Sequence, residues 1–340
     1  MATLPDYTLT IDNAATQTWH RLSGMVMDNI LEATPGWAWL KMKGCLQSQE
    51  GGELISEQIS YAYPATQDIQ KGTVLNMGET ETDTAAIFDF RNIGIHIQRT
   101  LLDDIANRGP DKLVDYVERK LTRARDGLKQ TFESRLWNTH RTDEGPPSVG
   151  QPKQMQAFND MVPPVATRAT GTYGRLARPT NYTSDVPDTG NTWWSPRYKQ
   201  FTANKEVNLI TDMDSFYNTV GNQQENVDGI FTTKELYELY TAFGLDQTQI
   251  VANTKLLQLG FDNARYRGAD LMWTPNMTGG TSGDMLYLNS NHIIVKYDPA
   301  AWFTMTPWQQ IPRQLERLAW ILCRCNMLTW QPRRHGRLYT

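Results

Sequence analysis

The spacing of apolar residues along the chain predicts both helices and strands. In residues 16–33 apolar side chains recur every three or four positions, which predicts a short amphipathic helix in an otherwise extended N-terminal segment. In residues 54–63 and 87–97 apolar and polar residues alternate, which predicts two strands, the first ending before Pro64. The N-terminal third therefore mixes extended structure with one helix.

A polar segment joins these two predicted strands. It reads PATQDIQKGTVLNMGETETDTAA and carries Lys71 and, in its outer part, Glu79, Glu81 and Asp83. Two strands with a long polar connection describe a projecting hairpin. Because an isolated hairpin is at best marginally stable in water, we expect this one to rest on another surface.

The strongest periodic signal predicts a helix over residues 110–137. Pro110 suits the first helical turn, and Asp111 complements the positive end of the helix dipole. At 1.5 Å per residue such a helix is about 40 Å long. Its apolar stripe consists of Leu113, Val117, Leu121, Ala124, Leu128, Phe132 and Leu136.

The remainder of the chain predicts a mixed α+β organisation. Residues 138–196 are rich in Pro, Gly and Thr and predict loops with short strands, which marks a boundary. Residues 211–222 and 232–243 predict helices, the second capped by Thr232 or Thr233. Strands are predicted for LMWTP, MLYLN, HIIVKY, AWFTMTPW and LAWILCRCNMLTW.

Composition and charge exclude several classes of protein. The 340 residues carry a formal net charge of -4, which favours neither DNA nor an anionic membrane as a global partner. No run of about 18 apolar residues and no secretory signal is found, so we expect a soluble protein made in the cytosol. The cysteines Cys45, Cys323 and Cys325 are odd in number and sparse, which indicates reduced thiols.

Metal and catalytic signals are weak. Cys323 and Cys325 share one face of a predicted strand, but no second ligand pair with zinc-finger spacing exists, so buried thiols are favoured over zinc. The D-x-D in TDMDS (211–215) stands where a helix should begin, and GGTSGD (279–284) lacks the lysine of a phosphate loop. The five histidines form no H-E-x-x-H motif, and no G-x-S-x-G motif occurs. We therefore expect no enzyme, cofactor or metal site.

Two further features allow a binding interpretation. Trp193 and Trp194 suit a sugar-binding platform, although large aromatic residues also dominate cores and subunit interfaces, and interface packing is favoured. Arg333 and Arg334, followed by His335 and Arg337, suit either phosphate or a neighbouring subunit.

The order of these parts resembles the major capsid protein of tailed double-stranded-DNA bacteriophages, which has the Hong Kong 97-type fold. The resemblance extends over nearly the whole chain. It is carried by the stretch from IGIHIQRT to FESRLWN, by WWSP, by GFDNARYRGADLMWTP and MLYLNSNHIIVKY, and by the closing QPRRHGRLY.

The resemblance implies an α+β capsid fold with four parts. Residues 1–45 would be the N-terminal arm and 46–97 the extended hairpin loop. Residues 98–145 and 286–340 would form the peripheral domain, with its long spine helix at about 110–137, and 146–285 the axial domain. CRCNMLTW would be a strand beside the spine helix, and QPRRHGRLYT an exposed end available to a neighbour.

The implied function is structural. Copies would assemble through hexamers and pentamers into an icosahedral head shell that encloses double-stranded DNA with weak, non-specific contact. The shell would belong to the virion, assembled in the host cytoplasm, with no membrane contact. The implied partners are a portal protein, a separate scaffolding protein and a decoration or cement protein.

Candidate contact residues between subunits follow from this resemblance and from charge. Glu79, Glu81 and Asp83 of the loop would meet basic groups of the neighbour, with Arg119 and Arg123 of the spine helix as candidates. Arg333 and Arg334 would also contact a neighbouring subunit. Lys71 stands where a cross-linking lysine would stand, but no acidic partner or asparagine context accompanies it, so no covalent cross-link is expected.

Two alternative functions compete with a phage capsid. An encapsulin-like cellular compartment shell shares the fold and differs in what it encloses. A carbohydrate-active or carbohydrate-binding protein, of a different class, would account for the tryptophans and the D-x-D.

Overall fold

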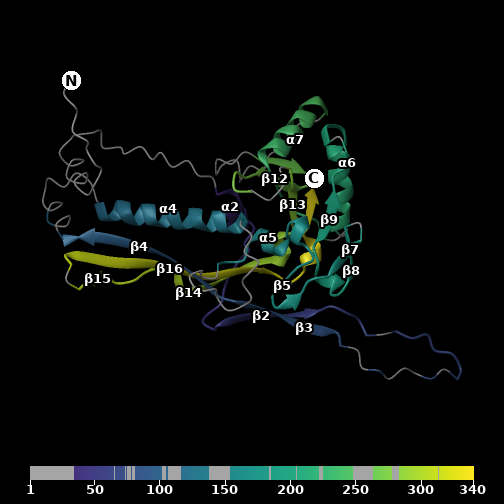
Figure 1. The fold of residues 1–340 in the computed structure, drawn as a ribbon, viewed down its shortest axis with the longest axis horizontal. Helices are drawn as coiled ribbons and strands as arrows, with labels where there is room; N and C mark the ends of the chain where they lie inside the picture. The colour runs from purple at the N-terminus through teal and green to yellow at the C-terminus, as the bar shows by residue number, and fades with distance from the viewer. Residues whose placement is uncertain are drawn as a thin grey trace. The chain divides into compact units, whose positions relative to one another are not determined.

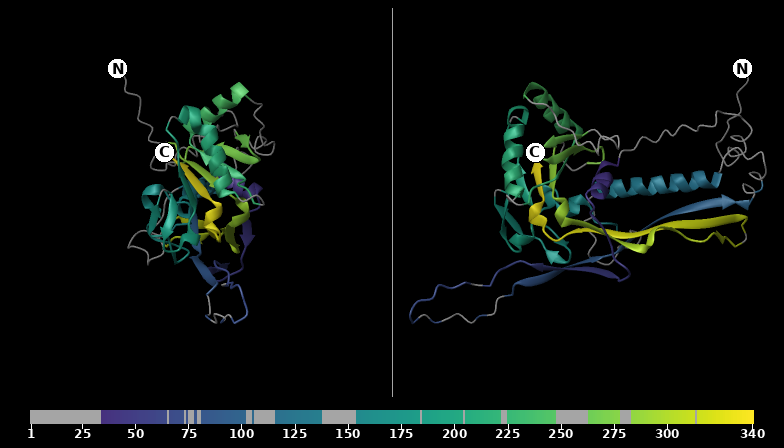
Figure 2. Two further views of the ribbon diagram at one scale, coloured as in Figure 1. Left: turned by 90° about the vertical axis from the view of Figure 1, so that its right-hand side faces the viewer. Right: turned by 180° about the vertical axis from the view of Figure 1, so that it is seen from behind.

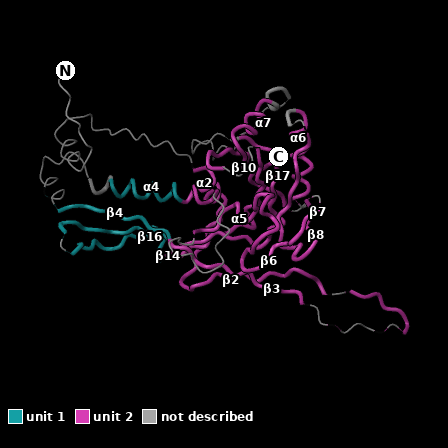
Figure 3. The backbone as a smooth tube through the Cα atoms, in the orientation of Figure 1, with its two compact units in different colours: residues 1–32, 93–131, 300–323 teal, residues 33–92, 132–299, 324–340 magenta. Residues whose placement is uncertain are grey.

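The computed structural model shows two compact units of the chain (Figure 3). The first unit holds residues 93–131 and 300–323, and the second holds residues 34–92, 132–299 and 324–340. The helix predicted at 16–33 lies outside the described residues. The structure describes residues 34–64, 66–72, 74, 78, 81–101, 105, 116–137, 154–183, 185–203, 205–221, 225–247, 263–277, 283–312 and 314–340.

The first unit is a long helix laid along a sheet. Helix α4 (Tyr116–Trp137) confirms the described part of the predicted spine helix, and its final turn belongs to the second unit (Figure 1). Ala124 and Leu128 are buried on α4, as are Ile93 and Ile97 on β4 (Arg91–Thr100). No helix among the described residues has both the length and the apolar character needed to span a membrane.

The sheet of this unit is completed by long strands from the C-terminal part. Strand β16 (Glu316–Thr329) pairs with β4, β14 (Ile293–Met305) and β15 (Gln309–Gln310). Strand β1 (Leu46–Ser48) pairs in parallel with β14. The stretches HIIVKY and AWFTM, predicted as two strands, form the single strand β14.

The predicted strand 87–97 was wrong as a single element. It divides at Phe90 into β3 (Asp83–Asp89) and β4, and only β3 pairs with β2 (Leu54–Ser60) as a hairpin. The buried residues are even-numbered up to Phe90 and odd-numbered from Arg91. Because side chains alternate faces along a strand, this change of parity forces the chain to turn its other face inward at Phe90.

The second unit is built on a six-stranded sheet. Its strand order is β11-β12-β10-β13-β17-β9. The central strand β10 pairs in parallel with β12 and antiparallel with β13. The strands are β9 (Arg197–Gln200), β10 (Gly229–Thr232), β11 (Asn263–Tyr266), β12 (Ala269–Trp273), β13 (Met285–Leu288) and β17 (Gly336–Tyr339).

Two helices cover one face of this sheet (Figures 1 and 2). Helices α6 (Lys205–Val220) and α7 (Lys234–Gln247) confirm the helices predicted at 211–222 and 232–243. Helix α6 begins six residues earlier than predicted, so TDMDS lies inside the helix and not at its start. Their contribution to the core includes Leu209, Met213, Phe216, Tyr217, Val220, Leu236 and Tyr237.

The C-terminal segment is buried, which contradicts the expectation of an exposed end. Strand β17 lies between β13 and β9, and His335, Arg337 and Leu338 are fully buried. The Arg337 guanidinium donates to Asp284 Oδ2 at 2.9 Å, to the Val162 carbonyl at 3.0 Å and to Asn159. Strands β13 and β17, which we assigned to the peripheral segment 286–340, thus share a sheet with strands of segment 146–285.

An aromatic cluster covers the opposite face of the sheet. Phe231 of β10 contacts Trp39 and Trp137, with ring centroids 5.4 and 5.1 Å apart, and Phe158 stacks on it at 6.0 Å. At Gly229 an added Cβ would lie 2.3 Å from the Trp39 ring, so only glycine admits this approach. Trp39 belongs to helix α2 (Pro35–Met42). The sequence did not predict this helix, because its eight residues are too few to show a periodic pattern.

Short elements complete the second unit and confirm the predicted loops with short strands. Two small hairpins, β5–β6 and β7–β8, follow helix α5 (Phe158–Met161). Their strands are β5 (Thr172–Tyr173), β6 (Leu176–Ala177), β7 (Asn181–Thr183) and β8 (Val186–Thr189). The 3₁₀ turns are η1 (Val165–Thr167), η2 (Thr192–Trp194), η3 (Ser290–His292) and η4 (Pro332–Arg334).

A buried carboxylate joins α2 to the last turn of α4. Glu133 is 1% exposed, and its oxygens accept hydrogen bonds from Gly36 N at 3.0 Å, Trp37 N at 2.8 Å and Trp137 Nε1 at 2.8 Å. Two of these donors are backbone N–H groups of the first turn of α2, where a helix offers no carbonyl acceptor of its own. Burial raises the pKa of Glu133, while the three hydrogen bonds oppose this rise.

We expect Glu133→Gln to lower the free energy of unfolding by about 1–3 kcal/mol, because the amide replaces one acceptor oxygen with a donor that faces another donor. Chemical denaturation followed by circular dichroism measures this loss. Glu238→Gln, on an exposed face of α7, is the matched control and should change stability by less than about 0.5 kcal/mol. Equal effects of the two substitutions would contradict a structural role for the Glu133 carboxylate.

Candidate assembly surfaces

The β2–β3 hairpin carries the loop residues singled out in the sequence. Lys71 and Glu81 are exposed beyond the paired strands, and neither has an ion-pair partner among the described residues. Asp83 lies in β3 opposite Ser60, whose hydroxyl donates to its carboxylate. Glu79 lies outside the described residues. The hairpin thus presents Glu81 freely, whereas Asp83 already takes part in the strand pairing.

Apolar side chains are exposed on the same loop. Tyr63 is 93% exposed, Ile69 69% and Val74 87%. Apolar side chains left in water on a projecting segment are typical of a surface that binds another protein. Sequence reasoning missed them because it weighed the acids of the segment, although isolated apolar residues within a polar stretch were the available signal.

The base of the hairpin is held firmly within the second unit. Ile87 N donates to the Gly174 carbonyl at 3.0 Å, and Lys296 pairs with Glu57. Tyr61 stacks on Trp193, with ring centroids 4.9 Å apart. The loop therefore leaves from a fixed position.

Arg324 secures the start of β2 beside a polar cleft. Its guanidinium contacts Asp298 Oδ2 at 3.2 Å and lies 4.7 Å from the centre of the Phe90 ring. It also donates to the Gly52 carbonyl. The cleft of about 510 Å³ is lined by Glu53, Leu54, Asp89, Phe90, Asn92, Arg175 and Arg324. Arg324 is paired with Asp298 and Arg175 with Asp89, so we interpret the cleft as part of the hairpin base.

The basic candidates differ in their surroundings. Arg123 is exposed on α4, and the Arg119 side chain lies outside the described residues. Arg333 is exposed, and the side chain of Arg334 is 19% exposed beside Glu225. The pairing of loop acids with spine arginines joins two copies of the chain and stays a prediction.

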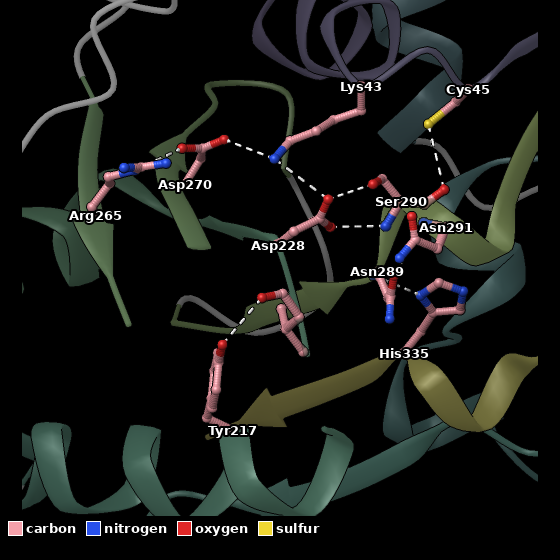
Figure 4. A network of polar contacts seen from close by, with 11 residues as sticks. Lys43, Cys45, Tyr217, Asp228, Arg265, Asp270, Asn289, Ser290, Asn291 and His335 are labelled. Atoms are coloured by element: carbon pink, nitrogen blue, oxygen red, sulfur yellow. Dashed lines mark hydrogen bonds and ion pairs between the residues drawn. The ribbon is translucent and has the colours of Figure 1, made fainter. Parts of the chain in front are cut away.

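A polar network fastens the end of α2 to the six-stranded sheet (Figure 4). Lys43 Nζ lies 3.4 Å from Asp228 Oδ2 and 3.3 Å from Asp270 Oδ2. Asp270 is fully buried and also faces Arg265 at 3.6 Å. Asp228 accepts a hydrogen bond from Ser290 N at 2.8 Å. The positively charged side chains of Lys43 and Arg265 neutralise these carboxylates. We therefore assign the network a structural role.

His335 is a buried neutral histidine at the edge of this network. Its Nδ1 accepts from Asn289 N at 3.2 Å, which assigns the proton to Nε2, and Nε2 faces Thr329 Oγ1 at 3.0 Å. Burial, with a smaller effect from the nearby His292, lowers the pKa of His335 to about 3. Protonation of Nδ1 would therefore place a donor opposite the donor Asn289 N and break this hydrogen bond inside the fold.

The cysteines confirm the interpretation as buried thiols. Cys45, Cys323 and Cys325 are all free and buried. Burial raises the pKa of Cys45 to about 12 and that of Cys323 to about 11, which makes both thiols poor nucleophiles. Across the described ranges, no group of three His, Cys, Asp or Glu side chains is arranged to hold a metal ion.

The D-x-D has partners that leave no metal site. Asp212 accepts hydrogen bonds from Thr202 N at 2.8 Å and Thr202 Oγ1 at 2.9 Å and pairs with Lys199 Nζ at 3.0 Å. Asp214 pairs with Arg267 at 3.0 Å and accepts from the Tyr266 hydroxyl. Both carboxylates serve the fold.

The tryptophan pair forms no open platform. Trp194 is buried and its Nε1 donates to the Tyr173 carbonyl at 2.9 Å. Trp193 is half-buried under Tyr61, and the two tryptophan rings are tilted by 52°. A sugar ring would find no flat pair of exposed indoles here.

Comparisons with known proteins find similar solved structures. No family model matches the chain, and no curated protein matches it either. The capsid asymmetric unit of cyanophage A-1(L) matches with a TM-score of 0.65 and 13% identity, covering 94% of this chain and 95% of that chain. The capsid of Myoviridae phage XM1 matches with a TM-score of 0.57 and 8% identity, covering 94% and 96%.

An encapsulin matches nearly as well. The holo-SrpI encapsulin complex of Synechococcus elongatus PCC 7942 has a TM-score of 0.56 and 11% identity, covering 99% of this chain and 95% of that chain. The chain therefore has the fold of shell proteins, the Hong Kong 97-type fold that the order of its parts predicts.

We expect stability to depend on pH through His335. Because its folded pKa is about 3 against an ordinary 6.5, the unfolded chain binds a proton that the folded chain does not. The part of the free energy of unfolding that depends on neutral His335 is fully present above pH 6.5. It is lost as pH falls toward 3, at roughly 1.4 kcal/mol per pH unit.

The variant His335→Gln isolates this effect, since its amide can accept from Asn289 and donate to Thr329 without titrating. Urea unfolding at pH 7 and pH 5 should show a smaller acid loss in His335→Gln than in the wild type. His96→Gln, at an exposed position, is the control and should keep the wild-type loss. An unchanged acid loss in His335→Gln would contradict the assignment.

Proposed function

We propose that the protein is a major capsid protein of a tailed double-stranded-DNA phage. The observation that carries the proposal is the match of the whole fold to phage capsid proteins, over 94% of this chain and 95% of the A-1(L) capsid protein. The role is structural, and we propose no enzymatic activity. The protein would reside in the virion shell after assembly in the host cytoplasm.

Self-association through the hairpin fits the exposed surfaces. The loop has a firm base, while Tyr63, Ile69 and Val74 extend into water. Covering these side chains with a second copy would remove apolar surface from water, which stabilises association by about 25 cal/mol per Å² before the costs of ordering. Each loop would therefore lie over a neighbouring subunit within hexamers and pentamers.

Charge would orient the same contact. Glu79 and Glu81 would face Arg119 and Arg123 of the neighbour, with Asp83 contributing less because Ser60 already holds it. Arg333 and Arg334 remain further candidates for subunit contact. Lys71 is exposed in a turn, and we propose no covalent cross-link there.

We propose two revisions of the division into parts. We retain 1–45 as the arm, and we limit the extended loop to the β2–β3 hairpin and its tip. Strands β13 and β17 belong with the axial part, because they share its six-stranded sheet. Portal, scaffolding and decoration proteins, and enclosed DNA in weak contact, are the partners we propose.

An encapsulin-like shell is the second candidate, favoured by the match to the SrpI encapsulin. A carbohydrate-binding function loses its support, because the tryptophans are covered and the D-x-D carboxylates are paired. The content of purified particles separates the two shells: a genome indicates a phage capsid, and an enclosed enzyme indicates an encapsulin.

Negative-stain electron microscopy of the purified chain over a range of concentrations, beside light scattering, tests the proposal. We expect closed shells or rings of five and six subunits. A chain that stays monomeric at every concentration, also after addition of its scaffolding protein, would argue against a capsid function.

A charge swap tests the contact of loop and spine helix. Glu81→Lys should lower particle yield severalfold, and adding Arg123→Glu to the same chain should restore it, because the pair is re-formed with opposite signs. Asp188→Lys, an exposed acid on β8, is the control and should leave the yield unchanged. Absence of rescue would show that Arg123 is not the partner.

Loss of the apolar loop side chains should reduce assembly without unfolding the subunit. Ile69→Ser with Val74→Ser should lower particle yield at least tenfold, while the melting temperature of the unassembled chain stays the same, because both side chains are exposed in it. Val186→Ser, at an exposed apolar position on β8, is the control. Normal particles from the double variant would exclude the loop apolar residues from the contact.

A further inference from the structure

Three arginines from two segments gather at the edge of the six-stranded sheet. Arg197 begins the edge strand β9, and Arg333 and Arg334 lie in η4. Strand β9 runs parallel to β17 with Arg197 opposite Gly336, and Arg197 N donates to the His335 carbonyl at 2.9 Å. The sheet therefore holds Arg197 beside η4. We call Arg197, Arg333 and Arg334 the arginine cluster.

Two of the three arginines lack counter-charges among the described residues. Within the described part of the chain, the side chains of Arg197 and Arg333 have neither an acidic partner nor a hydrogen-bond acceptor. Burial lowers the pKa of Arg197, and the positive charges of Arg333 and Arg334 lower it further. A half-buried guanidinium facing like charges is unfavourable in the isolated chain and is relieved by an anion.

The Arg334 side chain is held in place by two partners and still has hydrogen-bond donors to offer. Its Nε lies 3.5 Å from Glu225 Oε2 and donates to Gln331 Oε1 at 3.3 Å, so its two terminal nitrogens are left for another acceptor. Glu225 is shared with His292 Nε2 at 3.0 Å. One carboxylate against three guanidinium groups leaves the cluster with a net positive charge.

The turn that presents the cluster is rigid. Pro332 occupies the first position of η4, Arg334 N donates to the Gln331 carbonyl at 3.1 Å, and His335 N donates to the Pro332 carbonyl at 2.9 Å. Pro332 and His335 are buried on either side of the two arginines. The arginines are thus held in place before any ligand arrives, which reduces the entropy lost on binding.

We infer that the arginine cluster binds a phosphate group. A carboxylate has two oxygens and is matched by the fork of a single guanidinium, whereas a phosphate offers more oxygens to several donors at once. The phosphate comes either from the backbone of nucleic acid or from free phosphate. In a chain of net charge -4, this local site would confine contact with nucleic acid to a small area and make it independent of base sequence.

The salt dependence of DNA binding tests the nucleic-acid source. Fluorescence anisotropy with the full chain and a short DNA duplex is measured between about 50 and 200 mM NaCl. Arg197→Gln with Arg333→Gln should reduce the slope of log K against log salt by about 2, equally for duplexes of different sequence. Lys234→Gln, which removes an exposed positive charge on α7, is the control and should keep the wild-type slope.

Thermal unfolding with pyrophosphate tests the free ligand. Pyrophosphate should raise the melting temperature of the wild type and of Lys234→Gln, and should fail to raise that of the double variant. If pyrophosphate acts in this way while the DNA slope is the same in all three chains, free phosphate is the source. If the double variant matches the wild type in both measurements, the inference is wrong.

Two further readouts separate binding from folding and from subunit contact. Without ligand, Arg197→Gln should keep or raise the wild-type melting temperature because it removes an unpaired, half-buried charge, whereas Arg337→Gln should lower it strongly because Arg337 is buried and paired. If the double variant loses particle yield without DNA and keeps its response to pyrophosphate, the cluster binds a carboxylate of a second copy, and the inference is overturned while the proposed assembly stands.

Discussion

The carboxylate of Glu133 is the contact on which the second unit depends. It ties the last turn of α4 to the first turn of α2, and α2 carries Trp39 into the aromatic cluster that covers one face of the six-stranded sheet. Gly36 and Gly229 allow these close approaches. A Cβ at position 36 would meet Glu133 and Trp137, and a Cβ at position 229 would meet the Trp39 ring. A charged group is tolerated in this core because three donors converge on it, which offsets the cost of removing the carboxylate from water.

The fold separates surfaces that are satisfied within one chain from surfaces that are not. The carboxylates Asp212, Asp214, Asp228 and Asp270 all have basic or hydrogen-bonding partners and serve the sheet and its helices. Glu81 of the loop and Arg197 and Arg333 of the arginine cluster have no oppositely charged partner among the described residues. The proposed assembly and the inferred phosphate contact would use these surfaces, because partners from outside the chain could satisfy them.

The C-terminal segment contains arginines of both kinds, one satisfied within the chain and others left for partners. Arg337 is enclosed by Asp284, Asn159 and Val162 and holds β17 in the centre of the sheet. Arg333 and Arg334, a few residues earlier, stay outside because η4 turns them away from the core. Arginines of one short segment thus have different roles. Arg337 contributes to stability because it meets the buried Asp284, whereas Arg333 and Arg334 contribute to binding.

The sequence by itself determined α4, α6, α7, the C-terminal strands and the buried thiols, because their apolar spacing is local and repeats over several turns or alternations. The order of these parts also indicated the capsid fold, and the loop acids and Arg333 with Arg334 were visible as charges. Tertiary structure alone decided the change of face at Phe90, helix α2, the burial of Arg337 and the addition of Arg197 to the cluster. Each of these depends on partners far away in the chain, and local periodicity carries no information about which distant strand or carboxylate a residue will meet.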